Sequence, residues 1–319
     1  MPAQVMKDNV DSSLHYIKMI PFITIITSPK PFSDSHIATI QRNAIQSWTH
    51  LGPEVEVILI GTEPGLIEVA EEYKLKHLPD VKRNDSGTPL VSSIFSLAHQ
   101  SSRSPFLAYV NADILLLPDV IDATKQVAKQ TERFLLIGQR WDLDVSNLLD
   151  FSPGWDSRVR SEVSEHGCLH LPAGSDYFVF PRELFTDMPD FAIGRAGWDN
   201  WMIYHAKQQD WTVVDGTPSI MVIHQNHDYS HLPGGRPHYE QDESRVNEQL
   251  AGGIQNLYMV LDCDMQLREG RLSKPRPNLV WALRRAEVWF APSDGNYRKT
   301  RRVISRRFRR LRRRITGSL

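Results

Sequence analysis

The chain has 319 residues, 41% hydrophobic and 24% charged, an ordinary composition for a globular protein with one large domain or two smaller ones. It has only two cysteines, Cys168 and Cys263, too far apart in sequence for a disulfide scaffold or a zinc motif, and this usage favours a reducing compartment. The net charge of −1 conceals a segregation, because residues 298–319 hold eleven Lys and Arg and no Asp or Glu, which leaves residues 1–297 at −12.

Strand and helix patterns alternate through the first half of the chain. Residues 1–20 are expected to form an N-terminal extension, and a helix is expected to start at Thr88-Pro89, with Thr88 as its N-cap. Buried strands are predicted at 21–27, 54–60, 106–110 and 134–138, and helices at 35–49, 65–74 and 118–130. The alternation predicts an α/β fold with a mostly parallel central sheet flanked by helices.

The second half continues this domain to residue 265 and then changes character. Further strands are predicted at 177–180, 211–214 and 220–223, with helices at 198–208 and 237–250. Residues 266–297 are Pro-rich and read as an irregular linker with a helix at 278–289, and residues 298–319 read as a basic tail. The expected domain therefore covers residues 21–265.

Polar residues follow the predicted parallel strands at their carboxyl ends, where ligands bind in sheets of this kind. Thr27 and Ser28 end the first strand, Glu63 follows the second, and Asn111-Ala112-Asp113 follows the strand at 106–110. Side chains alternate across a strand, so Asn111 and Asp113 are expected to point the same way. Two such oxygen-bearing groups could hold a divalent cation or a ribose; the alternative is a strand that simply ends in a turn.

Three segments together resemble glycosyltransferases of the GT-A fold, over roughly residues 20–260. Asn111-Ala112-Asp113 stands where that family has its Asp-x-Asp motif. Residues 174–182 (Gly-Ser-Asp-Tyr-Phe-Val-Phe-Pro-Arg) and 193–201 (Ile-Gly-Arg-Ala-Gly-Trp-Asp-Asn-Trp) resemble a subgroup of nucleotide-diphospho-sugar transferases, as does the His-rich segment 224–231. The family's first Asp is Asn111 here, which removes one negative charge from the motif.

The resemblance implies a nucleotide-diphospho-sugar donor and a divalent metal, Mn²⁺ or Mg²⁺, that stabilises charge on the leaving diphosphate. It implies Asp113 as metal ligand and Asn111 as a partner of the ribose or donor sugar. His224 or His227 would supply a further ligand or contact the phosphate, and Mn²⁺ accepts imidazole more readily than Mg²⁺ does. The alternative for each histidine is a hydrogen-bonded polar residue at a strand end.

The resemblance places the nucleotide pocket at the ends of the first two strands, where Thr27, Ser28 and Glu63 lie. Arg83 and Asp85, just before the helix expected at Thr88, are further candidates, because a helix N-terminus suits an anion. The alternative is that residues 85–87 (Asp-Ser-Gly) form only a turn.

Two acidic residues are candidates for the chemistry at the acceptor. If the transfer inverts the anomeric centre, a base must accept the acceptor hydroxyl proton, and Asp199 stands where inverting GT-A enzymes have an acidic residue. Asp176 is expected to hydrogen-bond acceptor hydroxyls. The alternative for Asp199 is a first-turn Asp stabilised by the helix dipole, and that dipole is expected to lower its pKa.

The tail carries apolar residues at helical spacing among its arginines: Ile304, Phe308, Leu311 and Ile315. A basic amphipathic helix is typical of a membrane-surface anchor, so residues 298–319 are predicted to bind an anionic membrane, with nucleic acid the less favoured partner. No secretory signal or transmembrane stretch is recognised in the sequence. We therefore expect a cytoplasmic protein, peripheral on the cytoplasmic membrane face, with a glycan, a lipid-linked or another hydroxyl acceptor.

Two other functions fit the same strand order. A sugar-1-phosphate nucleotidyltransferase should have a Gly-rich phosphate loop after the first strand, whereas this chain has Ser-Pro-Lys-Pro-Phe at 28–32. A non-catalytic GT-A-like scaffold, bound to membrane or RNA through its tail, would explain Asn111 as a mark of lost catalysis.

Overall fold

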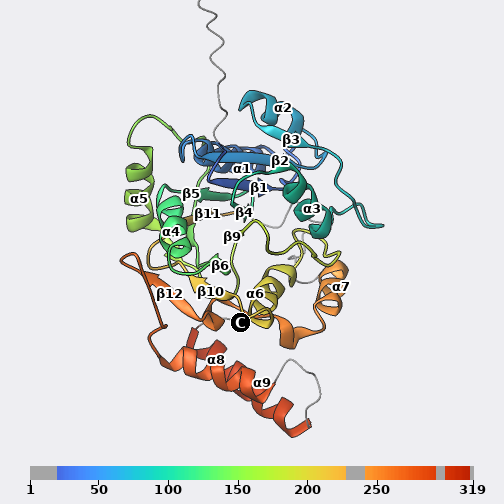
Figure 1. Cartoon of the computed structure of the whole chain (residues 1–319), viewed down its shortest axis with the longest axis vertical. Coiled ribbons are helices and arrows are strands. Elements are labelled where there is room, and N and C mark those ends of the chain that lie inside the picture. Colours follow the sequence, from blue (N-terminus) through green and yellow to red (C-terminus); the bar gives the residue numbers. More distant parts are fainter. Residues whose placement is uncertain (1–19, 228–240, 292–298, 317–319) are drawn as a thin grey trace, which may run out of the picture.

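A nine-stranded sheet forms the centre of the molecule (Figure 1). The structure is a computed structural model that describes residues 20–227, 241–291 and 299–316. The strands of this sheet are β1 (Ile23–Thr27), β2 (Val55–Ile60), β3 (Lys76–Leu78), β4 (Phe106–Val110), β6 (Phe134–Ile137), β9 (Tyr177–Pro181), β10 (Thr212–Asp215), β12 (Met265–Arg268) and β13 (Arg271–Ser273). Their order is β13-β12-β10-β6-β9-β4-β1-β2-β3, and only β9 and β13 run antiparallel to their neighbours.

Helices cover both faces of this sheet, as the alternating sequence pattern predicts. The helices of the described chain are α1 (Ser35–Thr49), α2 (Leu66–Glu72), α3 (Val91–Ser101), α4 (Asp119–Ala128), α5 (Trp155–His166), α6 (Trp198–Gln208), α7 (Asp242–Leu250), α8 (Leu279–Phe290) and α9 (Lys299–Thr316), with short 3-10 turns η3 (Ile254–Asn256) and η4 (Val260–Asp262). One core lies between the sheet and α3 and α6, the other between the sheet and α1 and α4. The expected α/β fold with a mostly parallel, helix-flanked sheet is confirmed.

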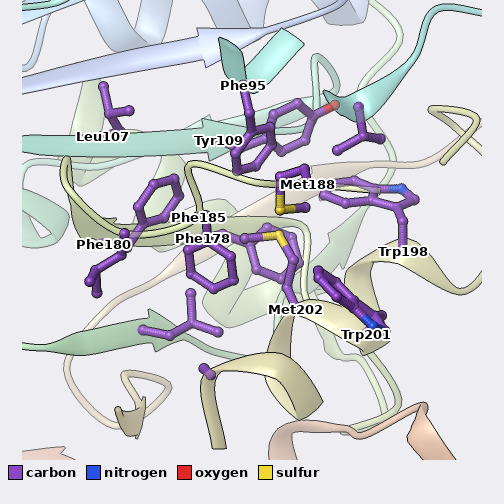
Figure 2. Close-up of a cluster of buried hydrophobic side chains, with 14 of the residues drawn as sticks. Phe95, Leu107, Tyr109, Phe178, Phe180, Phe185, Met188, Trp198, Trp201 and Met202 are labelled. Carbon is purple, nitrogen blue, oxygen red and sulfur yellow. The ribbon is translucent and has the colours of Figure 1, made fainter. Parts of the chain in front are cut away.

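Strand β4 shows how the sequence builds the two cores. Leu107 and Tyr109 enter the core beneath α3 and α6, whereas Ala108 and Val110 enter the core beneath α1 and α4. Figure 2 shows the first of these cores, in which Tyr109 meets Trp198 edge to face with ring centroids 4.9 Å apart. Because Trp198 begins α6, its burial fixes the first turn of that helix beside the end of β4.

A second, four-stranded sheet lies next to the first and contains the polar residues Asp142 and His224. Its strands are β5 (Ile114–Leu116), β7 (Trp141–Leu143), β8 (Cys168–Leu169) and β11 (Val222–Gln225), in the order β5-β11-β7-β8. The register pairs His224 with Ile114 on one side and with Asp142 on the other. Residues far apart in sequence thereby meet at the end of β4, where the segment 111–113 leads into β5.

Two departures from the sequence-based expectations concern the bounds of expected elements. The helix expected at Thr88-Pro89 begins at Val91, because Pro89 and Leu90 form bridges to Arg83 and Ala192 and are held extended. The segment expected to be irregular after residue 265 instead begins with β12 and β13, so the expected boundary falls inside β12. Residues 1–19, 228–231 and 237–240, on which parts of the predictions fall, lie outside the described residues.

The predicted C-terminal basic helix is α9, which packs on α8 at the end of the molecule opposite to α2 (Figure 1). Among the described residues, no helix combines the length and apolar character needed to cross a bilayer.

Candidate functional site

The segment Asn111-Ala112-Asp113 forms a turn between β4 and β5. The Ile114 amide donates to the Asn111 carbonyl at 3.1 Å, and the buried Trp48 indole of α1 donates to the Ile114 carbonyl at 3.0 Å. The two polar side chains of the turn have different partners. Asn111 Nδ2 donates to Asp176 Oδ1 at 2.8 Å, whereas Asp113 Oδ2 lies 3.2 Å from His227 Nε2. The run is therefore both a turn and a source of site residues.

Asp113, His224 and His227 form a cluster of potential metal ligands. One ligand atom from each lies within 4.8 Å of the other two. Asp113 is 9% exposed, and its Oδ1 is buried without a hydrogen-bond partner among the described residues. A buried carboxylate oxygen without a partner is costly unless a cation or donor meets it. We call these three residues the ligand cluster.

Lys30 adds a positive charge to the ligand cluster. Its Nζ lies 3.2 Å from His227 Nε2 and 3.7 Å from Asp113 Oδ2. The buried Gln41 side chain of α1 holds the Lys30 backbone on both sides, accepting from its N–H at 2.7 Å and donating to its carbonyl at 2.9 Å. Burial opposes ionisation of Asp113, yet the hydrogen bond from His227 and the nearby charge of Lys30 hold the pKa of this carboxyl below its ordinary value.

Asp142 supports the ligand cluster from the neighbouring strand. Its Oδ1 lies 3.4 Å from His224 Nδ1 and accepts from Arg140 Nε at 2.9 Å, and its Oδ2 is 2.7 Å from His170 Nδ1. Burial opposes its ionisation, but the hydrogen bond from His170, the nearby His224 and the charge of Arg140 keep its pKa below the usual range. A carboxylate on one ring nitrogen of a histidine orients the other nitrogen toward a metal.

Asp176 lies between Asn111 and Arg140. The Asn111 amide N–H donates to the Asp176 carbonyl at 2.9 Å, which extends the β4–β9 ladder by one residue. The Asp176 carboxylate accepts from the Asn111 side chain through Oδ1 and from Arg140 through Oδ2 at 2.8 Å. Each carboxylate oxygen can accept a second hydrogen bond, so Asp176 can still bind a hydroxyl group.

Asp199 is half-buried in the first turn of α6, near Asp176. Its Oδ1 accepts from the Gly197 amide at 3.2 Å, and a Cβ on Gly174 would lie 2.9 Å from its Oδ2. Burial, together with the charge of Asp176, raises the pKa of Asp199 to about 6. The lowering expected from the helix dipole is wrong, because burial outweighs the backbone N–H groups of the first turn.

The ends of β1 and β2 form a second group of polar side chains. Thr27 Oγ1 and Ser28 Oγ are both buried without partners among the described residues. Arg83 donates to Glu63 Oε1 at 2.9 Å, and Glu63 folds back against Gly61, where a Cβ would lie 2.2 Å from Glu63 Oε2 and 3.6 Å from Ser28 Oγ. Glycine at 61, with φ +134°, therefore keeps Glu63 beside the end of β1.

Asp85 belongs to the turn that follows Arg83, whose Nη1 donates to the Gly87 carbonyl at 2.8 Å. Residues 84–88 form an exposed turn, in which Asn84 Oδ1 accepts from the Ser86 and Thr88 amides at 3.0 and 2.9 Å. The turn interpretation of this segment thus describes its structure, and no contact in the described chain joins Asp85 to Asp113 or Asp199.

Sequence reasoning missed the charged residues around the predicted ones: Lys30, Arg140, Asp142 and His170. The available signal was positional, because Lys30 follows the first strand and residues 140–142 follow the strand that ends at Ile137. The contact of Asp142 with His224 depends on the β7–β11 register, and its contact with His170 on the pairing of β7 with β8, neither of which the sequence displays.

The ligand cluster fits a divalent cation. One buried carboxylate and two imidazoles suit a metal that accepts both oxygen and nitrogen ligands, which favours Mn²⁺ over Mg²⁺. The buried Asp113 Oδ1 without a partner and the carboxylate behind His224 are what such a site requires.

Comparison with known proteins finds similarity only at the level of structure. No protein-family model matches the chain, and no curated protein matches it in sequence. One similar solved structure is Staphylococcus aureus TarS 1-349, which is 10% identical in sequence, with 64% of this chain and 60% of that chain covered and a TM-score of 0.44. Another is Mycobacterium tuberculosis glucosyl-3-phosphoglycerate synthase with Mn²⁺, UDP and phosphoglyceric acid, which is 16% identical, with 73% of this chain and 79% of that chain covered and a TM-score of 0.45. A third is the Pyrobaculum calidifontis mannosyltransferase PcManGT with GDP-Man and Mn²⁺ (13%, 64% and 57%, 0.40). The resemblance read from the sequence names the same class of protein, but likenesses this low carry no argument about function, which has to rest on the site.

Proposed function

We propose that the chain is a metal-dependent glycosyltransferase that moves a sugar from a nucleotide-diphosphate donor to a hydroxyl acceptor. The observation that carries the proposal is the ligand cluster, with its buried and unpartnered Asp113 oxygen, at the carboxyl end of β4. It lies at the carboxyl-end edge of the parallel strands, where α/β proteins bind their ligands. The nearby Asp176 and Asp199 supply acidic groups for an acceptor.

Asp113, His224 and His227 would hold the metal, with Asp142 orienting His224. A divalent cation supplies charge stabilisation for a leaving diphosphate without proton transfer. Lys30 lies beside these ligands and presents a second positive charge to the same phosphates. The residues thus provide for the negative charge that develops when the bond between sugar and diphosphate breaks.

Thr27, Ser28, Glu63 and Arg83 would bind the nucleoside. The buried hydroxyls of Thr27 and Ser28 are donors without partners in the described chain, and they lie at the end of the strand beside β4. A ribose or base at this position could accept hydrogen bonds from them. Asn111, whose side chain donates one N–H to Asp176, would meet the ribose or donor sugar through its side-chain carbonyl oxygen or its second N–H.

Asp199 would act as the general base if the transfer inverts the anomeric centre. With a pKa of about 6 it is mostly ionised at neutral pH and still basic enough to accept a hydroxyl proton. A side chain at position 174 would crowd this carboxylate, since a Cβ on Gly174 would lie 2.9 Å from Asp199 Oδ2. Asp176, held by Arg140, would position the acceptor through a second hydroxyl.

The proposal is tested by calorimetry with UDP and GDP, with and without Mn²⁺. We expect affinity that depends on the metal, and its loss in Asp113→Asn. The matched control is Asp122→Asn, which removes an exposed carboxylate from α4. Failure of the wild-type chain to bind any nucleoside diphosphate would overturn the proposal and favour the scaffold alternative.

The donor sugar and the acceptor class follow from a screen of nucleotide-sugars for hydrolysis and transfer. A glycan or a lipid-linked hydroxyl is the expected acceptor. A nucleotidyltransferase would instead release pyrophosphate from a nucleoside triphosphate and a sugar 1-phosphate, which a parallel assay with those substrates distinguishes.

A further inference from the structure

The two C-terminal helices form a hairpin that packs as one unit. The rings of Phe290 on α8 and Phe308 on α9 stack with centroids 5.7 Å apart, and Ser305 Oγ donates to the Glu287 carbonyl at 3.0 Å. Figure 1 shows this pair of helices at one end of the molecule, where one long side of α9 has no other element against it. The hairpin therefore presents a surface of its own.

Some arginines of α9 are used inside the protein. The side chain of Glu287 is 2% exposed and accepts from Arg309 Nε at 2.7 Å and from Arg312 Nε at 3.1 Å. Arg284 joins the same carboxylate and also binds the buried Asp262 beside η4. These ion pairs fix α9 to α8 and α8 to the domain. We call the five residues that form them the latch: Asp262, Arg284, Glu287, Arg309 and Arg312.

Other arginines of α9 face outward. Five of them are exposed and have no acidic partner in the part of the chain that the structure describes: Arg306, Arg307, Arg310, Arg313 and Arg314. Large apolar side chains are exposed on the same helix, with Val303 at 47%, Leu311 at 47% and Ile315 at 45%. We call these eight residues the outer face.

We propose that the outer face docks the protein on an anionic membrane surface, with α9 lying in the plane of the interface. Positive charge at this density calls for an anionic partner. The aliphatic residues beside the arginines decide between the two anionic surfaces, because a lipid interface accepts aliphatic side chains whereas single-stranded nucleic acid is held by aromatic stacking. Phe308, the aromatic residue of α9, is already stacked on Phe290.

The latch gives this docking a structural consequence. Since Glu287 and Arg312 are buried, α9 cannot bind the membrane as a free tail without breaking a buried ion pair. The catalytic domain is thus held in one orientation relative to the membrane. On the proposed function, a domain held in this way can present its acceptor side to a substrate embedded in the bilayer.

Vesicle co-sedimentation of the full chain tests the proposal, using phosphatidylglycerol–phosphatidylcholine vesicles and pure phosphatidylcholine vesicles. Each arginine near an anionic leaflet raises the partition coefficient onto the vesicle about fivefold. The triple variant Arg307→Gln, Arg310→Gln, Arg314→Gln should therefore bind about 100-fold more weakly. The matched control changes three exposed cations elsewhere to Gln, Arg103, Lys82 and Lys129, and should bind like wild type. Equal loss in both triple variants would overturn the proposal, since overall charge and not the outer face would then explain binding.

A second variant separates lipid from nucleic acid. Leu311→Ser with Ile315→Ser keeps every charge and should weaken vesicle binding while leaving any binding to a single-stranded RNA oligonucleotide unchanged. Absence of wild-type binding to anionic vesicles, or tight RNA binding that only the arginine variant abolishes, would refute membrane docking. Thermal melts of each variant confirm that the latch, which none of the changes touches, keeps α9 in place.

Discussion

The pKa of Asp199 leads to a sharp prediction for the pH dependence of sugar transfer. Burial and the charge of Asp176 raise this pKa from 3.8 to about 6. A base with that pKa is about one-tenth ionised at pH 5 and about nine-tenths ionised at pH 7, so kcat/KM should rise about tenfold between these pH values. With a pKa of 3.8 the same interval would change the rate by less than about a tenth.

The assay is the initial rate of transfer from the identified donor between pH 4.5 and 8. The affinity for the nucleotide and the metal is measured at each pH and divided out, so that changes in binding are separated from changes in the transfer step. Asp176→Asn provides an internal test, because removing that charge should move the limb to lower pH even if it slows the reaction. A flat profile below pH 7 after this correction, or a limb that Asp176→Asn leaves in place, would remove Asp199 from the role of base.

Three further changes test the electrostatics of the molecule. Asp199→Asn should abolish transfer yet raise the free energy of unfolding at pH 7 by about 1–2 kcal/mol, because a partly exposed carboxylate with a raised pKa destabilises the fold above that pKa. Most of this gain in stability should disappear by pH 4, which urea titrations at the two pH values will test. Asn111→Asp should lower the free energy of unfolding by about 1–3 kcal/mol, because it places two carboxylates side by side. The double variant Asn111→Asp with Asp176→Asn should recover most of this loss in the same unfolding assay. No recovery would mean that the 2.8 Å contact between residues 111 and 176 is unimportant. Glu287→Gln should cost about 3–5 kcal/mol of α8–α9 docking and speed trypsin cleavage within α9, whereas unchanged cleavage would show that the latch does not hold the helix.

Local patterns in the sequence were sufficient for the main elements of the fold. The predicted helices at 35–49 and 198–208 coincide with α1 and α6, since their apolar residues recur at helical spacing and reach the core. The strands β12 and β13 were missed, because short strands with mixed polar residues at a sheet edge show no buried run. Helix α5 was missed as well, and with it the packing of the small sheet.

The site was predictable only where it depends on strand ends. Position in the sequence and the family resemblance identify Asp113 and Asp199 as candidates. The hydrogen bonds and pKa values of the two carboxylates, however, depend on neighbours from other elements. Asp142 meets His224 through a register between β7 and β11, 82 residues apart in the chain, and no periodicity reveals such a pairing. The sign of the Asp199 pKa shift was mispredicted for the same reason, because burial and Asp176 are tertiary effects while the helix dipole is local.

Asn111 is the residue at which the two interpretations of the motif differ most. As a substitute for an acidic metal ligand it would signal lost catalysis, but its amide nitrogen donates to Asp176, which also accepts from Arg140. A carboxylate at 111 could not donate this hydrogen bond and would repel Asp176 across the turn. Asp176, which directly precedes β9, thus supplies a carboxylate beside Asn111. The Asp113 carboxylate, the imidazoles of His224 and His227, and the Lys30 ammonium group provide the metal ligands and the positive charge that a diphosphate site needs. Asn111 therefore belongs to a network of charges that supports the proposed glycosyltransferase over the scaffold alternative.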